Sequence, residues 1–312
     1  MKLSIVTTLY YSSPYLRQFY ERTCVACAQV TDDFEIVLVN DGSPDDVLDI
    51  AVGLAETDER VKVVDLSRNF GHHKAAMTGL AHAQGDWVFL IDVDLEEVPE
   101  LLLPFYAELQ KNPKADVIYG VQDRRKGGFF ERLTGNLYYR TFNALSSHKI
   151  PVNLLMARLM SRRYVEALLL HRESELDIGG LWTLTGFKQV PLTVHKHSKP
   201  NSTYSLRRKI ALTIRAVTGF SNKPLLYIAG IGVFVLGLSF IYFLYILYIY
   251  LFAGTPPSGF TTIVLSIWFL GGLTIFSLGI IAIYLSVIFT ETKNRPYTII
   301  RQIYQSEKSN VE

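Results

Sequence analysis

Residues 87–100 read WVFLIDVDLEEVPE, so an apolar run leads directly into two aspartates. This pattern predicts a buried strand that ends on the carboxylates of Asp92 and Asp94. Because residues i and i+2 of an extended chain point to the same side, both carboxylates would face one space. At ~6 Å and an effective dielectric constant of about 20, two such charges repel by roughly 3 kcal/mol. A cation is therefore expected between them.

Carboxylate oxygens with room for water suit Mg²⁺ or Mn²⁺, which take one or two protein carboxylates and bind the remaining ligands through substrate phosphates. The alternative interpretation is a solvated acidic turn before a helix that starts near Val98. In that case Glu96 and Glu97 would suit the helix N-terminus. We predict a metal site at Asp92 and Asp94, and the roles of Glu96 and Glu97 stay open.

The pattern of an apolar run with a polar end recurs through the first 120 residues. Strands are predicted at residues 2–9, 34–40, 61–66, 86–91 and 116–120, and each gap is long enough for a helix. This order is typical of an α/β domain with a mainly parallel sheet covered by helices. Ligands of such sheets bind beyond the carboxyl ends of the strands.

Polar residues follow four of these predicted strands, and they would meet at one edge of the sheet. They are Thr7 and Thr8, the segment 40–43, the segment 67–69, and Asp92 with Asp94. We therefore expect a ligand site at this edge.

Residues 224–290 contain no Asp, Glu, Lys or Arg. Such a stretch is too long for a core helix, since a membrane span needs about 20 apolar residues. Gly and Pro residues near 253–259 mark a turn, which divides the stretch into two predicted transmembrane helices at about 225–252 and 260–289.

Basic residues flank the predicted hairpin, and the short connecting loop carries no charge. By the positive-inside rule, both flanks are expected on the cytoplasmic side of the membrane. The organisation that follows is a cytoplasmic catalytic domain over 1–200, a juxtamembrane region over 201–223, the hairpin over 224–290, and a cytoplasmic tail over 291–312.

The juxtamembrane region 201–223 is predicted to contain an amphipathic helix. Leu206, Ile210 and Ile214 fall on one helical stripe, and Arg207 and Arg215 lie off it. Such a helix can lie in the headgroup layer, where each cation adds ~1 kcal/mol near an anionic leaflet. The alternative is a helix that packs on its own domain.

Charge and cysteine content narrow the function classes. Lys and Arg (31) nearly balance Asp and Glu (29), which argues against nucleic acid as a partner. The two cysteines, Cys24 and Cys27, have the spacing of a redox pair or half of a zinc site, with His72 and His73 as distant partners. We interpret them instead as small residues of a helix. The segment RTCVACAQV around them lacks the turn residues of a thioredoxin-like active site, and the sequence has no second cysteine pair.

Three motifs occur in the order and spacing of family-two glycosyltransferases with the GT-A fold. They are VNDGSPDDV from Val39, SRNFGHHKAAMTGL from Ser67, and FLIDVDLEEVPE from Phe89. The two C-terminal helices and ETKNRPY at 291–297 narrow this resemblance to polyprenyl-phosphate glycosyltransferases. That group contains dolichol-phosphate mannose synthases and bactoprenol glucosyltransferases.

The resemblance implies specific roles at the donor site. Asp41 would hold the nucleoside, and Asp92 and Asp94 would hold the metal and the nucleotide diphosphate. Thr8 and Lys74 are assigned with them to the nucleotide site. A UDP or dTDP donor, with UDP-glucose as the first guess, and a homo-oligomer are also implied by the resemblance.

The resemblance places the acceptor phosphate near the segment 116–140, where Arg side chains can grip phosphate oxygens in pairs. Gln122 stands where relatives often carry Arg, so acceptor binding would shift onto Arg124, Arg125 or Arg132. We assign the phosphates to Arg125, Arg132 and Arg158. A basic surface loop is the alternative. Met156 stands where many relatives have Asp, so no base is assigned there.

Chemistry at a phosphate acceptor needs no such base, because a phosphate monoester with a second pKa near 6 is already mostly dianionic at neutral pH. The sequence thus predicts an inverting transfer of one sugar from a nucleotide sugar to polyprenyl phosphate at the cytoplasmic membrane face. Two alternatives stay open: an inactive membrane-anchored binding or scaffold protein, suggested by Met156 and Gln122, and transfer to a hydroxyl acceptor.

Overall fold

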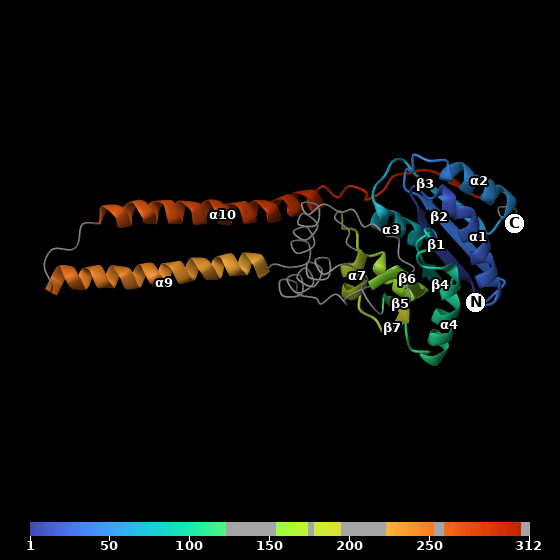
Figure 1. Ribbon diagram of the computed structural model, residues 1–312, viewed down its shortest axis with the longest axis horizontal. Helices are drawn as coiled ribbons and strands as arrows, with labels where there is room; N and C mark the ends of the chain where they lie inside the picture. Colours follow the sequence, from blue (N-terminus) through green and yellow to red (C-terminus); the bar gives the residue numbers. More distant parts are fainter. Residues whose placement is uncertain (123–153, 174–177, 195–222, 253–258, 307–312) are drawn as a thin grey trace. The chain divides into compact units, whose positions relative to one another are not determined.

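The computed structural model describes the chain except for residues 123–153, 174–177, 195–222, 253–258 and 307–312 (Figure 1). The described residues fall into two compact units. The first holds the α/β part together with the residues from Arg295 onward, and the second holds two long apolar helices.

Strands and helices alternate in the first unit, which confirms the predicted α/β class. Its elements in chain order are β1 (Leu3–Leu9), α1 (Ser13–Ala28), β2 (Phe34–Asn40), α2 (Val47–Thr57), β3 (Val61–Leu66), α3 (His72–His82), β4 (Trp87–Leu90), the 3₁₀ helix η1 (Pro99–Leu101), α4 (Leu102–Lys111), β5 (Val117–Gln122), β6 (Leu154–Ser161), α6 (Arg162–Leu168), α7 (Ile178–Leu184), β7 (Gln189–Val194) and β8 (Ile300–Tyr304).

One sheet in the described part of the chain has the strand order β7-β5-β6-β4-β1-β2-β3-β8. The predicted parallel arrangement is confirmed at its centre, where β4, β1, β2 and β3 pair in parallel. β6 runs antiparallel to both β4 and β5, and β8 runs antiparallel to β3. The carboxyl ends of the four central strands therefore share one edge, as expected.

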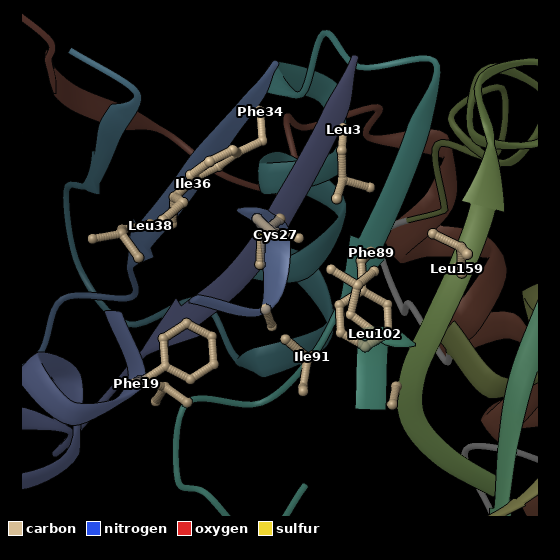
Figure 2. Packing of buried hydrophobic residues seen from close by; sticks show 14 of the residues in the cluster. Leu3, Phe19, Cys27, Phe34, Ile36, Leu38, Phe89, Ile91, Leu102 and Leu159 are labelled. Atoms are coloured by element: carbon tan, nitrogen blue, oxygen red, sulfur yellow. The ribbon is translucent and has the colours of Figure 1, made fainter. Parts of the chain in front are cut away.

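The sheet is covered on both faces. β1 and β2 are buried along their whole length, as strands with helices on both sides are. On one face, Phe19 and Cys27 of α1 pack with the apolar side chains of the central strands, for example Ile36 and Phe89 (Figure 2). This face is the main hydrophobic core of the domain.

α3 lies on the opposite face, unusually close to the strands. A Cβ atom on Gly79 would lie 2.5 Å from Val6 Cγ1 and 2.8 Å from Val39 Cγ2, so only glycine fits there. This contact seats α3 directly on β1 and β2. The start of α3, at His72, consequently lies near the carboxyl ends of these strands.

The residues after the apolar helices add a strand to the sheet. β8 pairs with β3, for example Val64 with Ile303 and Asp65 with Gln302, and Ser67 N–H donates to the Ile299 carbonyl over 2.9 Å. This segment was predicted only as a tail, because a five-residue strand with mostly exposed side chains gives no alternation to recognise.

The second unit contains α9 (Lys223–Phe252) and α10 (Phe260–Thr292), which contact each other. These bounds agree closely with the two helices predicted at about 225–252 and 260–289. Segments of both helices, Lys223–Ile249 and Ser266–Thr292, have a mean hydropathy of 2.3 and are long and apolar enough to cross a membrane. The predicted juxtamembrane helix falls almost wholly outside the described residues.

Candidate functional site

The two aspartates after β4 lie at a turn formed by Val93 and Asp94, so the extended backbone that the sequence argument assumed for this stretch is not present. Val93 between them is buried in the core, whereas Asp92 and Asp94 are partly exposed. The next residue, Leu95, has a left-handed backbone (φ 61°), and the Asp94 carboxylate accepts a hydrogen bond from Glu96 N–H over 3.0 Å. A non-glycine residue with positive φ is uncommon, so this tight turn holds the two carboxylates in a fixed loop.

His72, the first residue of α3, links the ends of two strands. Its Nδ1 lies 2.9 Å from Thr8 Oγ1 on β1, and its Nε2 lies 3.4 Å from Asp92 Oδ1 beyond β4. Burial lowers the pKa of His72, because it disfavours the charged imidazolium, while the negative charges of Asp41 and Asp94 act to raise it. The imidazole therefore contacts Asp92 and lies within the electrostatic influence of Asp41 and Asp94.

The Asp41 carboxylate is almost fully buried and holds a neighbouring loop. It accepts hydrogen bonds from the backbone N–H groups of Phe70 (2.7 Å) and Gly71 (3.0 Å). Burial raises its pKa above the ordinary aspartate value, while the two amides, His72 and Arg68 oppose that rise. Asp41 thus ties the loop after β2 to the loop that starts α3, and a nucleoside contact at this residue remains a prediction.

Gly42 makes the same connection through the backbone. Its φ is +58°, and a Cβ atom there would lie 2.4 Å from the carbonyl carbon of Arg68 and 2.5 Å from the nitrogen of Asn69. Glycine alone accepts both the backbone angle and this close approach. The two motif loops are therefore packed against each other with no side chain between them.

Thr8 and Lys74 complete the residues assigned to the nucleotide. Thr8 lies on β1, is nearly buried, and contacts His72 as described. Lys74 is in the first turn of α3, is partly buried, and shares that turn with His72. The structure therefore brings Thr8 and Asp92 together through His72, and Lys74 follows His72 by two residues in α3.

Glu97 lies apart from this group and does not cap a helix. Its side chain is 2% exposed, and it accepts hydrogen bonds from the backbone N–H groups of Ala157 (2.7 Å) and Met156 (3.4 Å) on β6. The interpretation of Glu97 as a helix N-terminal acid is wrong, because its carboxylate anchors the loop after Asp94 to β6. Met156 is held through its backbone by this contact.

Arg158 of β6 lies in the interior of the domain. It is 1% exposed, its guanidinium carbon lies 3.4 Å from the centre of the Trp182 ring, and its Nη1 lies 3.4 Å from Gln189 Oε1. Burial lowers its pKa to about 9, and its buried Nε has no hydrogen-bond partner among the described residues. Arg158 pairs in register with Leu90, the last residue of β4, and Asp92 follows Leu90 by two residues.

Other residues named from the sequence lie elsewhere. Arg125 and Arg132 lie outside the described residues, so their assignment to phosphate stays a prediction.

Cys27 of α1 packs in the core, and burial raises the pKa of its thiol to about 12, which opposes the thiolate that metal binding or redox chemistry needs. Cys24 is half-buried, and burial raises the pKa of its thiol as well.

His72 was not predicted from the sequence as a member of the donor site. The signal for it was its position, since it follows Gly71 (φ 100°) and opens α3 within the second motif. A helix start that faces the strand ends is a recurrent ligand position in α/β folds. The contacts with Thr8 and Asp92 could not be read from that pattern, because they join residues far apart in the chain.

The acidic pair fits a divalent cation that is shared with a ligand. Within the described residues, no three His, Cys, Asp or Glu side chains gather into a complete metal cage. Asp92 and Asp94 nevertheless offer carboxylate oxygens from one partly exposed loop. That donor set matches Mg²⁺ or Mn²⁺, which usually keep water and substrate phosphate as further ligands.

Comparisons with known proteins agree with the motifs. Residues 4–169 match the family model described as Glycosyl transferase family 2. A protein of Mycobacterium tuberculosis named "Putative glycosyltransferases" is 48% identical over 312 residues, which is all of this chain and 91% of that protein. The SfII prophage-derived bactoprenol glucosyl transferase of Shigella flexneri is 32% identical over 98% of this chain and 99% of its own length.

Proposed function

The chain belongs to glycosyltransferase family 2, and we propose that it transfers one sugar from a nucleotide sugar to polyprenyl phosphate with inversion at the anomeric carbon. Its fold is of the GT-A type, as the motifs predicted. The observation that carries the proposal is the group of Thr8, Asp41, His72, Asp92 and Asp94 at one sheet edge, in a chain that also has two membrane-length apolar helices.

The donor half of the site is built from the ends of β1, β2 and β4. Asp41 and Gly42 fix the loop before α3, and that loop leads directly into His72 and Lys74. We assign the nucleoside to Asp41 and the diphosphate to Lys74 and the loop of Asp92 and Asp94. A UDP or dTDP sugar is the proposed donor, with UDP-glucose first, in line with the bactoprenol glucosyl transferase name of relatives.

Asp92 and Asp94 would hold Mg²⁺ or Mn²⁺. When bound, such an ion neutralises charge on the departing nucleoside diphosphate. The protein's own contribution is to hold both carboxylates in place, through the left-handed turn at Leu95 and the anchoring of Glu97 to β6. A loop that is held in this way supports the proposal that activity depends on a divalent metal.

Arg158 is the proposed cation for a substrate phosphate. Arg158 carries its charge in the interior with no carboxylate partner among the described residues, and a buried charge is costly unless it is paired. We propose that a phosphate group, of the acceptor or of the donor, compensates Arg158 in the working complex. Arg125 and Arg132 are proposed as further phosphate contacts.

The reaction is a single displacement. An oxygen of the lipid phosphate attacks the anomeric carbon, the bond from this carbon to the diphosphate oxygen breaks, and the nucleoside diphosphate leaves with the electron pair. The attacking phosphate is already deprotonated at neutral pH, so a general base is not required. This explains why Met156 can replace an acid on β6.

Membrane attachment brings the lipid acceptor within reach. The bactoprenol glucosyl transferases are relatives along nearly the full chain, including α9 and α10. We propose that these helices cross the cytoplasmic membrane, with the catalytic unit and both flanks on the cytoplasmic side, as the flanking basic residues predict. Self-association through the helices is proposed with them.

The test is an assay of the purified full-length chain in detergent with undecaprenyl phosphate, Mn²⁺ or Mg²⁺, and labelled UDP-glucose, then other UDP, dTDP and GDP sugars. We expect a lipid-linked monosaccharide whose anomeric configuration is opposite to that of the donor. A folded protein that gives no lipid-linked sugar with any donor would support the scaffold alternative. Product formed without any lipid phosphate would support a hydroxyl acceptor.

A further inference from the structure

The segment that follows α10 contacts the donor side of the site. Besides the pairing of β8 with β3, Thr298 Oγ1 lies 2.8 Å from Thr78 Oγ1 on α3. The backbone of Ser67, at the end of β3, donates to the Ile299 carbonyl. The segment therefore touches both elements that border the loop 67–71, which Asp41 holds from the other side.

Arg301 of β8 makes two contacts with the first unit. Its Nη2 donates to the Ser67 carbonyl over 2.8 Å, and its Nη1 lies 3.3 Å from Asp65 Oδ2. The Asp65 carboxylate is fully buried, and Oδ2 has no aligned hydrogen bond within the described residues, so this contact is an ion pair. Arg301 supplies positive charge to a carboxylate that water does not reach.

Asp65 connects Arg301 to the loop 40–43 of the first motif through hydrogen bonds. Its Oδ1 accepts a hydrogen bond from Asn40 Nδ2 over 2.7 Å, and Asn40 Oδ1 accepts one from Ser43 N–H over 3.1 Å. Asn40 and Ser43 flank Asp41 and Gly42. A continuous polar chain thus runs from Arg301 through Asp65 and Asn40 to the loop that we assign to the nucleoside.

We propose that Arg301 is a positioning residue for nucleotide binding, so the segment after the apolar hairpin is a working part of the donor site. Arg301 fixes the loop 40–43 through Asp65 and Asn40, and it fixes the loop 67–71 through Ser67. This inference rests on the proposed function, since it names the donor nucleotide as the ligand of the two loops. Arg301 acts through these loops and does not touch the nucleotide.

Charge and shape both favour arginine at this position. The guanidinium donates through two nitrogens at once, to a carboxylate and to a backbone carbonyl, whereas a lysine ammonium is a single point charge. Without Arg301, the buried Asp65 would carry an uncompensated negative charge, and its hydrogen bond to Asn40 would be the remaining described contact.

The experiment compares full-length wild type with Arg301→Gln and Arg301→Lys in detergent. Binding of UDP with Mn²⁺ is measured by calorimetry, with dTDP and GDP as parallel probes, and steady-state kinetics separate donor KM from kcat. We expect Arg301→Gln to weaken nucleotide binding by roughly tenfold through donor KM, as expected for a residue in a coupled network. Arg301→Lys should recover part of this loss.

Hydrogen exchange provides a readout that needs no nucleotide. In Arg301→Gln, the amides of Ser43, Phe70 and Gly71 should exchange faster, while those of α4 should keep the wild-type rate. The matched control is Arg295→Gln, which removes the same charge from an exposed position six residues earlier. It should leave binding and exchange at their wild-type values.

The outcomes separate this inference from the proposed function. Arg301→Gln with wild-type nucleotide affinity and wild-type exchange would overturn the inference alone, even if its melting temperature fell. If Arg301→Gln exchanges faster but the wild-type protein binds no nucleotide, the proposed function would be overturned, and with it the positioning role of Arg301. If Arg301→Gln fails to fold, the double variant with Asp65→Asn removes the unpaired charge, and wild-type affinity in that variant would overturn the inference.

Discussion

The two halves of the sheet hold their charged groups in different ways. In the parallel half, from β4 to β3, Asp41 accepts from two backbone amides, and Asp92 lies beside His72. In the other half, from β6 to β7, Arg158 lies against the face of Trp182 and has no carboxylate partner among the described residues. In the first half, Asp41 and Asp92 thus have protein contacts before any ligand arrives, whereas the second half carries a charge that a ligand phosphate could compensate.

This difference predicts which property, donor binding, activity or stability, each substitution should change. Substitutions in the parallel half should disturb a preformed donor site, and substitution of Arg158 should cost activity without costing stability. Four variants test that division, from the largest expected effect to the smallest.

Asp94→Asn should lower turnover by roughly a thousandfold, because one of the two carboxylates that would hold the cation is lost. Initial rates at several Mn²⁺ concentrations provide the measurement, and Asp49→Asn on the exposed face of α2 is the matched control. Full metal-dependent turnover in Asp94→Asn would show that the metal is held elsewhere.

Gly42→Ala should separate the two motif loops, because the new methyl group would meet the backbone of Arg68 and Asn69 at a positive φ. A strain of about 2 kcal/mol corresponds to roughly 30-fold weaker UDP binding. Gly53→Ala is the control, since a Cβ atom on this α2 residue meets nothing within 4 Å and a helical glycine gains from the change. Equal UDP affinities in the two variants would contradict the proposed loop contact.

Arg158→Met should lower turnover about tenfold, because a charge-assisted contact to phosphate is worth roughly 1.5–3 kcal/mol. The free energy of unfolding should stay the same or rise, because removing an unpaired buried cation is often neutral or stabilising. Chemical denaturation and kinetics measure the two effects, with Arg17→Gln, at an exposed position of α1, as the control. A large loss of stability with unchanged turnover would make Arg158 a structural residue.

His72→Ala should raise donor KM about fivefold, which corresponds to the loss of one neutral hydrogen bond. His72→Asn keeps a polar atom near the position of Nδ1, so it should retain part of the contact with Thr8. The KM for the nucleotide sugar distinguishes the three proteins. If His72→Ala has the wild-type KM, the imidazole does not help to shape the donor site.

Local pattern was sufficient to predict the centre of the fold and the two long apolar helices, whereas the metal site at Asp92 and Asp94 stays a prediction. The apolar runs before Asn40 and Asp92 are continuous in sequence, and residues 224–290 carry no charged side chain, so periodicity and composition predicted the strands and the two membrane-length helices.

Contacts between distant residues could not be predicted in this way. Thr8 and His72 are 64 positions apart, Glu97 and Ala157 are 60 apart, and Ser67 and Arg301 are 234 apart. Each depends on how strands and helices pack, and none leaves a periodic signal. The antiparallel β6 shows the same limit, because an apolar run alone does not give the direction in which a strand enters a sheet.

The position of β8 also sets an order for biosynthesis. β8 follows α9 and α10 in the chain, so the ribosome completes both apolar helices before it makes the strand that covers the edge of β3. Until then β3 has an unpaired edge, which is a site for pairing with other chains. Folding of the catalytic unit therefore finishes only after the hairpin has been synthesised, and a nascent chain stalled within the hairpin would expose an open sheet edge to other nascent chains and to chaperones.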